Sequence, residues 1–250
     1  GKPIHASIYE ELRLMLATGK LAPGAPLSTR GLAQQLGVSQ MPAREALSRL
    51  AAEGAIAIHS KRQIKVPDMT PDRLNEVMDC RLLLEPEAAV AALPHINKEM
   101  LGQLEMIDAQ LDEALERGDL NQYMDSNFRF HFAIYGAGGT TLLKRLIETL
   151  WLQFGPMMRV VYGRVGTVAL VDCHAMAIDA IRRGDGVALH DAIRRDILDG
   201  MKLITGQAKA SETTSDSRSA QQRLDPQRSD RIADRRMARR PKSIKSNTHA

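Results

Sequence analysis

The stretch STRGLAQQLGVSQMPAREALSRLAAEGAIAIHSKRQIKV, residues 28–66, decides the fold of the amino-terminal part of the chain. Ser28 is a capping residue ahead of a short apolar periodicity, and Gly37 can end that helix because glycine enters the left-handed region without strain. Ser39 can cap a second helix, whose apolar residues recur at helical spacing until Gly54. The stretch therefore predicts two short helices joined by a tight turn.

Two short segments rich in Ile and Val follow these helices, Ala55–His59 and Gln63–Val66. Between them lie Ser60, Lys61 and Arg62, so the segments predict a β-hairpin with a basic tip. Two helices, a turn and a hairpin are the layout of a winged helix-turn-helix, a module that binds DNA.

The charge of the chain is divided between its regions in a way that fits this interpretation. Residues 1–67 hold nine basic and four acidic side chains, a net of +5, whereas residues 68–210 hold 15 basic and 21 acidic side chains, a net of −6. The positive end suits a phosphate backbone and the larger body does not.

Composition indicates a mostly α-helical protein, and the length allows two domains, or one domain and a tail. The chain has 250 residues, of which only 4% are aromatic, while Leu, Ala, Ile and Met abound. Cys80 and Cys173 form no CxxC pair, so neither a disulfide framework nor a cysteine zinc site is indicated, and reduced thiols in a cytoplasm fit best. No stretch predicts a membrane span or a signal-peptide core.

The middle of the chain reads as helix after helix, which predicts an antiparallel bundle of about six. Thr70 and Asn97 are expected to start the first two helices, and Pro86 is expected to kink or break the first. The expected helices are Thr70–Ala92, Asn97–Gly118, Leu120–Tyr135, Thr141–Tyr162, Thr167–Arg183 and Asp185–Ile204.

We therefore divide the chain into a DNA-binding domain at 1–67, a helical effector-binding and dimerisation domain at 68–208, and a tail at 209–250. From Ser211 the chain carries ten basic and five acidic groups and almost no apolar residues, so we expect it to be disordered. Two alternatives stay open for it: added non-specific attraction to DNA, or a solvated terminus of no specific role.

Four side chains in the bundle are candidates for a metal site. Asn127 and His131 are four residues apart, hence on one face of a helix. His174 and Asp196 are 22 residues apart across the expected turn at 184–186, which brings two helices into register. The four can converge on a metal ion, but such pairs also arise by chance in long helices and make ordinary hydrogen bonds.

Several motifs resemble a known family. LAQQLGVSQMPAREALSRLAAEG resembles the amino-terminal domain of GntR-family bacterial transcription regulators, and MDCRLLLEPEAA, NFRFHFAIY, WLQFGP and AIRRDI resemble the all-helical, FCD-type ligand-binding domain of the FadR subgroup. The resemblance implies a homodimer that binds a palindromic DNA operator. It also implies that a small carboxylate metabolite in the bundle controls this binding, with repression relieved by the ligand as the commoner case.

The same resemblance implies a divalent metal, held in this subgroup by an Asp four residues before a His and by two later histidines. The matching positions are Asn127, His131, His174 and Asp196, so the carboxylate has moved to another helix and the summed ligand charge is −1. A divalent ion would leave +1, which suits an anionic effector. Zinc is expected, with nickel or manganese as alternatives, and Asn127 either ligates the metal or hydrogen-bonds a metal-bound water or the effector.

The resemblance also implies residues that contact DNA. They lie at the start of the helix that follows Ser28, in the recognition helix that follows Ser39, and at the wing tip. These are Arg30, Ser39, Gln40, Arg44, Lys61 and Arg62. Gln40 stands where arginine is usual. Because glutamine pairs best with adenine N6 and N7, we expect a preference for adenine at the base that it faces.

Arg81 and Arg159 match positions where related proteins use arginine toward the ligand or across helices. For both, effector binding and a buried pair with Glu85 or Glu87 are equal alternatives.

The expected function is thus a metabolite-responsive transcription regulator and not an enzyme. A rival is a small metalloenzyme, but the chain lacks the paired Glu-x-x-His motifs of bundle di-metal enzymes. A third alternative is an architectural DNA-binding protein whose body only dimerises. For a regulator, the segment Pro67–Pro71 is the expected joint between the two domains.

Overall fold

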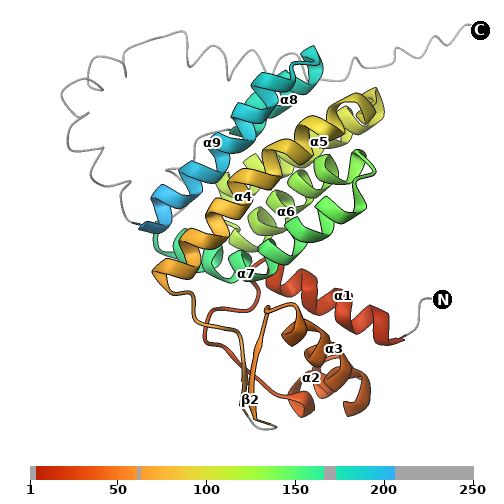
Figure 1. Ribbon diagram of the computed structural model, residues 1–250, viewed down its shortest axis with the longest axis vertical. Helices are drawn as coiled ribbons and strands as arrows, with labels where there is room; N and C mark the ends of the chain where they lie inside the picture. The colour runs from red at the N-terminus through yellow and green to blue at the C-terminus, as the bar shows by residue number, and fades with distance from the viewer. Residues whose placement is uncertain (1–3, 61–62, 166–172, 206–250) are drawn as a thin grey trace, which may run out of the picture. The chain divides into compact units, whose positions relative to one another are not determined.

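The computed structural model describes residues 4–60, 63–165 and 173–205, and these residues are mostly helical (Figure 1). Lys61, Arg62 and the expected tail lie outside the described residues. Within the described ranges, the elements in chain order are α1 (Ile4–Ala17), β1 (Pro26–Leu27), α2 (Thr29–Gln35), α3 (Gln40–Ala52), β2 (Ala57–Ser60), β3 (Gln63–Lys65), α4 (Pro71–Ala92), η1 (Leu93–His95, a 3-10 helix), α5 (Lys98–Arg117), α6 (Leu120–Ala137), α7 (Thr141–Val165), α8 (Cys173–Arg183) and α9 (Gly186–Thr205).

The two expected helices of the amino-terminal module are α2 and α3. The Ser28 hydroxyl accepts a 2.9 Å hydrogen bond from the Gly31 N–H, which caps α2 as predicted. Gly37 has φ +64°, so it supplies the left-handed turn between the helices. Ser39 precedes α3 but makes no side-chain cap hydrogen bond, so the predicted cap at this position is wrong.

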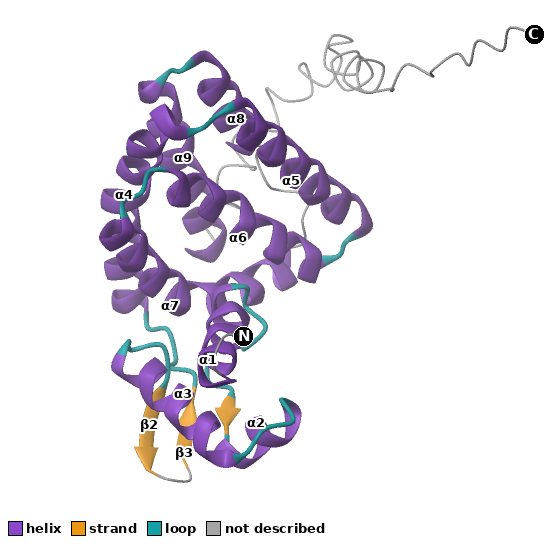
Figure 2. Ribbon diagram, turned by 90° about the vertical axis from the view of Figure 1, so that its right-hand side faces the viewer, coloured by secondary structure: helices purple, strands orange, loops and turns teal. Residues whose placement is uncertain are grey.

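The hairpin is present as β2 and β3, and both strands are shorter than expected (Figure 2). A third strand, β1, was not predicted. It pairs antiparallel with β3, with Leu27 opposite Ile64, so the sheet order is β1-β3-β2. A two-residue strand has too little sequence pattern to be seen without its partner.

Helix α1 was not predicted either. Its Leu12 and Leu16 side chains are fully buried, and the helix packs against both α3 and α7. It closes the core of the DNA-binding module and contacts the bundle.

The bundle consists of the six helices α4 to α9, as expected. The Thr70 hydroxyl accepts from the Arg73 N–H, and the Asn97 side chain accepts from the Met100 N–H, so both predicted caps form. The predicted start of the fifth helix at Thr167 lies outside the described residues, where α8 is described from Cys173.

Pro86 does not break α4, which runs without interruption from Pro71 to Ala92. Of the two expected outcomes, the break is therefore wrong, and the kink stays a prediction. A proline in a helix removes one backbone hydrogen bond, but tertiary packing can outweigh this cost. Glu85, Pro86, Ala88 and Ala89 are all buried, so packing holds the helix through this point.

In the bundle, α5 packs against α6, and α9 packs against both α4 and α8. The largest buried side chains of the bundle, Trp151, Tyr135 and Phe130, lie on α7 and α6. These aromatic residues surround the cluster described below. Among the described residues, none of the helices has the length and apolarity needed to span a bilayer.

Helix α7 touches α1 backbone to backbone. A Cβ atom added to Gly155 would lie 2.3 Å from the carbonyl oxygen of Leu16 and 2.5 Å from that of Ala17. Only glycine permits this approach. The Arg13 side chain donates a 2.9 Å hydrogen bond to Glu148 of α7, which adds an ion pair to the same contact.

Candidate functional site

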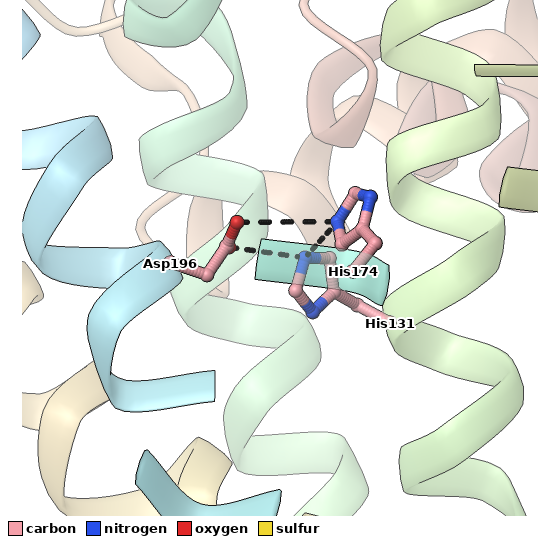
Figure 3. Close-up of side chains that lie close together, drawn as sticks. All are labelled: His131, His174 and Asp196. Atoms are coloured by element: carbon pink, nitrogen blue, oxygen red, sulfur yellow. Dashed lines mark hydrogen bonds and ion pairs between the residues drawn. The ribbon is translucent and has the colours of Figure 1, made fainter. Parts of the chain in front are cut away.

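Two histidines and one aspartate converge inside the bundle from three different helices. His131 comes from α6, His174 from α8 and Asp196 from α9, and their potential ligand atoms all lie within 4.8 Å of one another (Figure 3). The Nε2 atom of His131 is 3.4 Å from His174 Nε2 and 3.3 Å from Asp196 Oδ2. His174 Nε2 lies 3.9 Å from Asp196 Oδ1.

These separations fit a tetrahedral metal ion. Ligand bonds of about 2.0–2.2 Å place neighbouring ligand atoms of a tetrahedron roughly 3.3–3.6 Å apart. The separations of His131 Nε2 from His174 Nε2 and from Asp196 Oδ2 meet this value, whereas the 3.9 Å separation of His174 Nε2 is from the other carboxylate oxygen, Oδ1. Imidazole nitrogens and a carboxylate oxygen are also donors that zinc accepts, and three protein ligands leave one position open. The residues present therefore fit a divalent ion.

The cluster lies in an apolar, mostly buried environment. His131 is fully buried, whereas the Asp196 side chain is 27% exposed, so the cluster is open on the side of α9. Burial raises the pKa of the Asp196 carboxyl, but the adjacent His131 and His174 side chains lower that pKa to about 2. Asp196 is thus ionised at neutral pH, as a ligand must be.

Each histidine presents its other ring nitrogen to a polar group. His131 Nδ1 lies 3.0 Å from the Tyr135 hydroxyl, which donates a 2.8 Å hydrogen bond to Glu85 Oε2. His174 Nδ1 lies 3.8 Å from Asp108 Oδ1, beyond hydrogen-bond distance but close enough for attraction. Metal-binding histidines commonly have such outer partners.

Glu85 connects three helices at this point. It accepts hydrogen bonds from Arg81 on its own helix, from the Tyr135 hydroxyl on α6 and from Trp151 Nε1 on α7. Burial raises the pKa of the Tyr135 hydroxyl well above 10.0, and the charge of Glu85 raises it further, so the hydroxyl keeps its proton. The sequence analysis did not find this network, although the spacing of Tyr135 four residues after His131 was a usable signal.

Asn127 lies one helical turn before His131 and is 4% exposed, so the predicted shared face exists. The converging ligand atoms are those of the other three predicted residues. A ligand role for Asn127 stays a prediction.

The two arginines proposed for the effector have different surroundings. Arg81 is buried and donates 2.5 and 3.3 Å hydrogen bonds to Glu85, which was one of the two alternatives for it. Its guanidinium also lies 4.1 Å from the centre of the Phe154 ring. Arg159 is partly exposed and donates to Asn121 Oδ1 at 2.7 Å. Neither arginine pairs with Glu87, and effector binding by either stays a prediction.

Four of the six predicted DNA contacts lie on the exposed surface of the amino-terminal module. Arg30 is in the first turn of α2, and Ser39, Gln40 and Arg44 lie at the start of α3. The opposite face of α3 is buried through Ala43, Ala46, Leu47 and Leu50. Lys61 and Arg62 lie outside the described residues, so the wing tip stays a prediction.

Known protein families match both the amino-terminal module and the helical bundle. Residues 4–66 match the family described as bacterial regulatory proteins, gntR family, and residues 76–199 match the FCD domain. The HTH-type transcriptional regulator McbR of Escherichia coli (strain K12) is 33% identical over 174 residues, which cover 68% of this chain and 79% of McbR. The HTH-type transcriptional repressor RspR of the same organism is 26% identical over 197 residues, which cover 78% of this chain and 86% of RspR.

Solved structures give the same assignment. The structure of E. coli McbR/YncC matches with a TM-score of 0.78 and 27% sequence identity, over 83% of this chain and 99% of that chain. These relatives are transcription regulators, the class of protein that the sequence analysis expected. The chain belongs to the gntR family of bacterial transcription regulators, and its second domain is an FCD domain.

Proposed function

We propose that this regulator is a repressor. A small carboxylate metabolite, bound beside a divalent metal ion in the bundle, weakens the binding of the repressor to its operator. The observation that carries the proposal is the cluster of His131, His174 and Asp196, which assembles three metal-capable atoms from three helices. A regulator that senses a metabolite needs a ligand site outside its DNA-binding domain, and the three converging side chains can form such a site.

The charge of the cluster favours an anionic effector. Two neutral imidazoles and one carboxylate sum to −1, so a divalent ion would leave the site at +1. A zinc ion bound there would supply a Lewis acid that accepts a carboxylate oxygen. The buried amide of Asn127, one turn from His131, is a hydrogen-bond donor that can orient the same carboxylate.

On the DNA side, we propose that α3 enters the major groove. Gln40 and Arg44 are four residues apart and both exposed, so they share the face opposite the buried residues. Gln40 would read adenine, and Arg44 would pair with guanine or clamp a phosphate. Arg30, Ser39, Lys61 and Arg62 complete the proposed contact set.

We further propose a homodimer on a palindromic operator, acting in the cytoplasm, with domains at 1–67 and 68–208 and a tail at 209–250. The symmetry of a palindrome is matched by a two-fold symmetric protein.

The contacts of α7 support a route between the two sites. Trp151 on this helix donates to Glu85, which is linked through Tyr135 to His131, and Gly155 on the next turn touches the carbonyl end of α1. A ligand that shifts α7 would therefore move α1 and the module that reads DNA. The expected joint at Pro67–Pro71 is complemented by this direct contact.

The test begins with elemental analysis of protein purified without a His-tag. We expect about one zinc or other divalent ion per chain, and none in His131→Ala. His95→Ala is the matched control, because His95 is an exposed histidine outside the cluster. No stoichiometric metal in the unmodified protein, or equal metal in both variants, would remove the metal centre.

A thermal-shift screen of small organic acids with zinc then tests the effector. A ligand at a hundred times its Kd should stabilise the protein by about 2.7 kcal/mol. An acid that stabilises the unmodified protein and not His131→Ala would support the proposal. The architectural alternative predicts no acid-dependent shift.

A further inference from the structure

The two ring nitrogens of His131 face different partners, and the chain of hydrogen bonds on one side constrains the proton on the ring. Nδ1 lies 3.0 Å from the Tyr135 hydroxyl, and Nε2 lies 3.3 Å from Asp196 Oδ2. A neutral imidazole carries one proton, so only one of these nitrogens can donate.

The Glu85 carboxylate acts only as an acceptor. Arg81 Nε and Nη2 lie 2.5 and 3.3 Å from its two oxygens, and Trp151 Nε1 lies 3.0 Å from Oε1. Guanidinium and indole nitrogens have no lone pair to offer, so each of these contacts uses a carboxylate lone pair. The third partner, Tyr135, must likewise donate to Glu85, and its oxygen is 2.8 Å from Oε2.

A tyrosine hydroxyl has a single proton. Because that proton is directed at Glu85, the hydroxyl can meet His131 Nδ1 only with a lone pair, so Nδ1 must carry the ring proton. Asp196 draws the proton toward Nε2 instead, but it lies farther away and is partly exposed. Nε2 also lies 3.4 Å from His174 Nε2 on α8, a contact that either nitrogen can donate, and the ring packs against Phe130 and Trp151.

The geometry points to Tyr135 and Glu85 as positioning residues that hold the proton of neutral His131 on Nδ1, which leaves the Nε2 lone pair directed at the cluster. Their importance for metal binding rests on the proposed function, but the tautomer itself does not. The Arg81 guanidinium makes Glu85 on α4 an acceptor, and Glu85 makes the Tyr135 hydroxyl on α6 a donor. The Tyr135 oxygen then accepts from Nδ1, so the other ring nitrogen, which faces the cluster, has no proton. The bundle thus prepares one nitrogen of His131 for a metal.

Substituting Tyr135→Phe removes only the hydroxyl and is the sharpest test. Without it, the other polar contacts described for the ring, to Asp196 Oδ2 and His174 Nε2, are both on the Nε2 side, so we expect the tautomer to change from Nδ1–H to Nε2–H. The tautomer is read from the ¹⁵N shifts of the histidine rings in metal-free protein, at a pH high enough that the rings are neutral. Because a bound metal must then displace this proton, we expect zinc affinity to fall about 10- to 100-fold in a competition titration with a chromophoric chelator.

Tyr123→Phe is the matched control, since Tyr123 is a second buried tyrosine on α6. It should leave both the tautomer and the zinc affinity unchanged. An unmodified protein with His131 protonated at Nε2 overturns the inference, and this measurement does not depend on any variant folding. A folded Tyr135→Phe protein with unchanged tautomer and zinc affinity overturns it as well.

Failure of the inference and failure of the metal centre are distinguishable. If the unmodified protein binds no zinc but His131 carries its proton on Nδ1 and loses it to Nε2 in Tyr135→Phe, the positioning is supported and the proposed metal centre fails. If zinc binds but the proton is on Nε2 in the metal-free protein, the metal centre stands and the positioning fails.

Discussion

The DNA-reading module and the bundle cluster are built in opposite ways. In residues 28–66, each turn and cap is decided by neighbours in the sequence, such as the Ser28 hydroxyl on the Gly31 N–H. The cluster instead joins His131 to Asp196, 65 residues later, and depends on a network through three helices. We therefore expect substitutions in the module to affect only nearby structure or DNA contacts. Substitutions in the bundle network should also change properties of distant residues, such as metal binding.

The largest expected effect is that of breaking the buried network at its centre. Arg81 and Glu85 are 3% and 0% exposed, so Glu85→Gln would leave a buried guanidinium without its counter-charge. We expect a loss of about 3–5 kcal/mol in the free energy of unfolding, measured by urea denaturation. Zinc affinity should fall as well, because the Tyr135 hydroxyl loses its fixed acceptor.

The control for this prediction is Glu113→Gln, which breaks an exposed pair with Arg117 at the same helical spacing. That change should cost less than about 1 kcal/mol. Equal losses for the two variants would contradict the account of a bundle organised around Glu85.

The next effect concerns the contact between the two regions. Gly155→Ala would place a methyl group against the backbone carbonyls of Leu16 and Ala17, so α1 or α7 must shift. We expect a cost of about 1–3 kcal/mol and an altered response of DNA binding to effector. Gly102→Ala on α5 has open space around it, and should instead stabilise the protein by roughly 0.4–1 kcal/mol. A stable Gly155→Ala protein with unaltered response would show that this contact carries no signal.

A change of base preference should leave the bundle untouched. Gln40→Arg is expected to move the preferred base from adenine to guanine, with a discrimination of about 1–3 kcal/mol, because arginine pairs with guanine O6 and N7. Selection of binding sites from a random DNA pool measures it. Recovery of the same sequence by both proteins would place Gln40 away from the base edges.

The smallest expected effects are those of substituting Ser28 and Ser39, two serines that each precede a helix but differ in whether they cap it. Ser28→Ala removes an observed cap and should cost about 1 kcal/mol of stability, whereas Ser39 makes no cap hydrogen bond, so Ser39→Ala should cost almost none. If Ser39 contacts phosphate, its variant should lose DNA affinity instead. Thermal melting and DNA titration of both variants decide this, and equal melting losses would count against the assignment.

Much of the fold could be predicted because its signals are local. The glycine at Gly37, the caps at Ser28 and Asn97 and the helical periodicities act within one or two turns, and all are confirmed. Strand β1 was missed because it exists only through its pairing with β3. The break expected at Pro86 does not occur because packing, which spacing does not reveal, outweighs the local cost of the proline.

The candidate site divides in the same way. All four of its residues were predicted from spacing together with the family resemblance, and three of them converge, while a ligand role for Asn127 stays a prediction. The Glu85–Tyr135–His131 relay could not be predicted, because it requires α4, α6 and α7 to be brought together first. For Arg81, the pair with Glu85 is present, and effector binding stays a prediction.

The most direct test of the central claim, that a metal centre in the bundle controls DNA binding by the amino-terminal module, is a fluorescence-anisotropy titration of the DNA upstream of the chain's own gene. It uses zinc-loaded protein with and without the acid that stabilises it most in the thermal-shift screen. We predict that the acid weakens DNA binding about 5- to 150-fold in the unmodified protein and has no effect in His131→Ala. An identical response of the two proteins, or no response in the unmodified protein, would contradict the account.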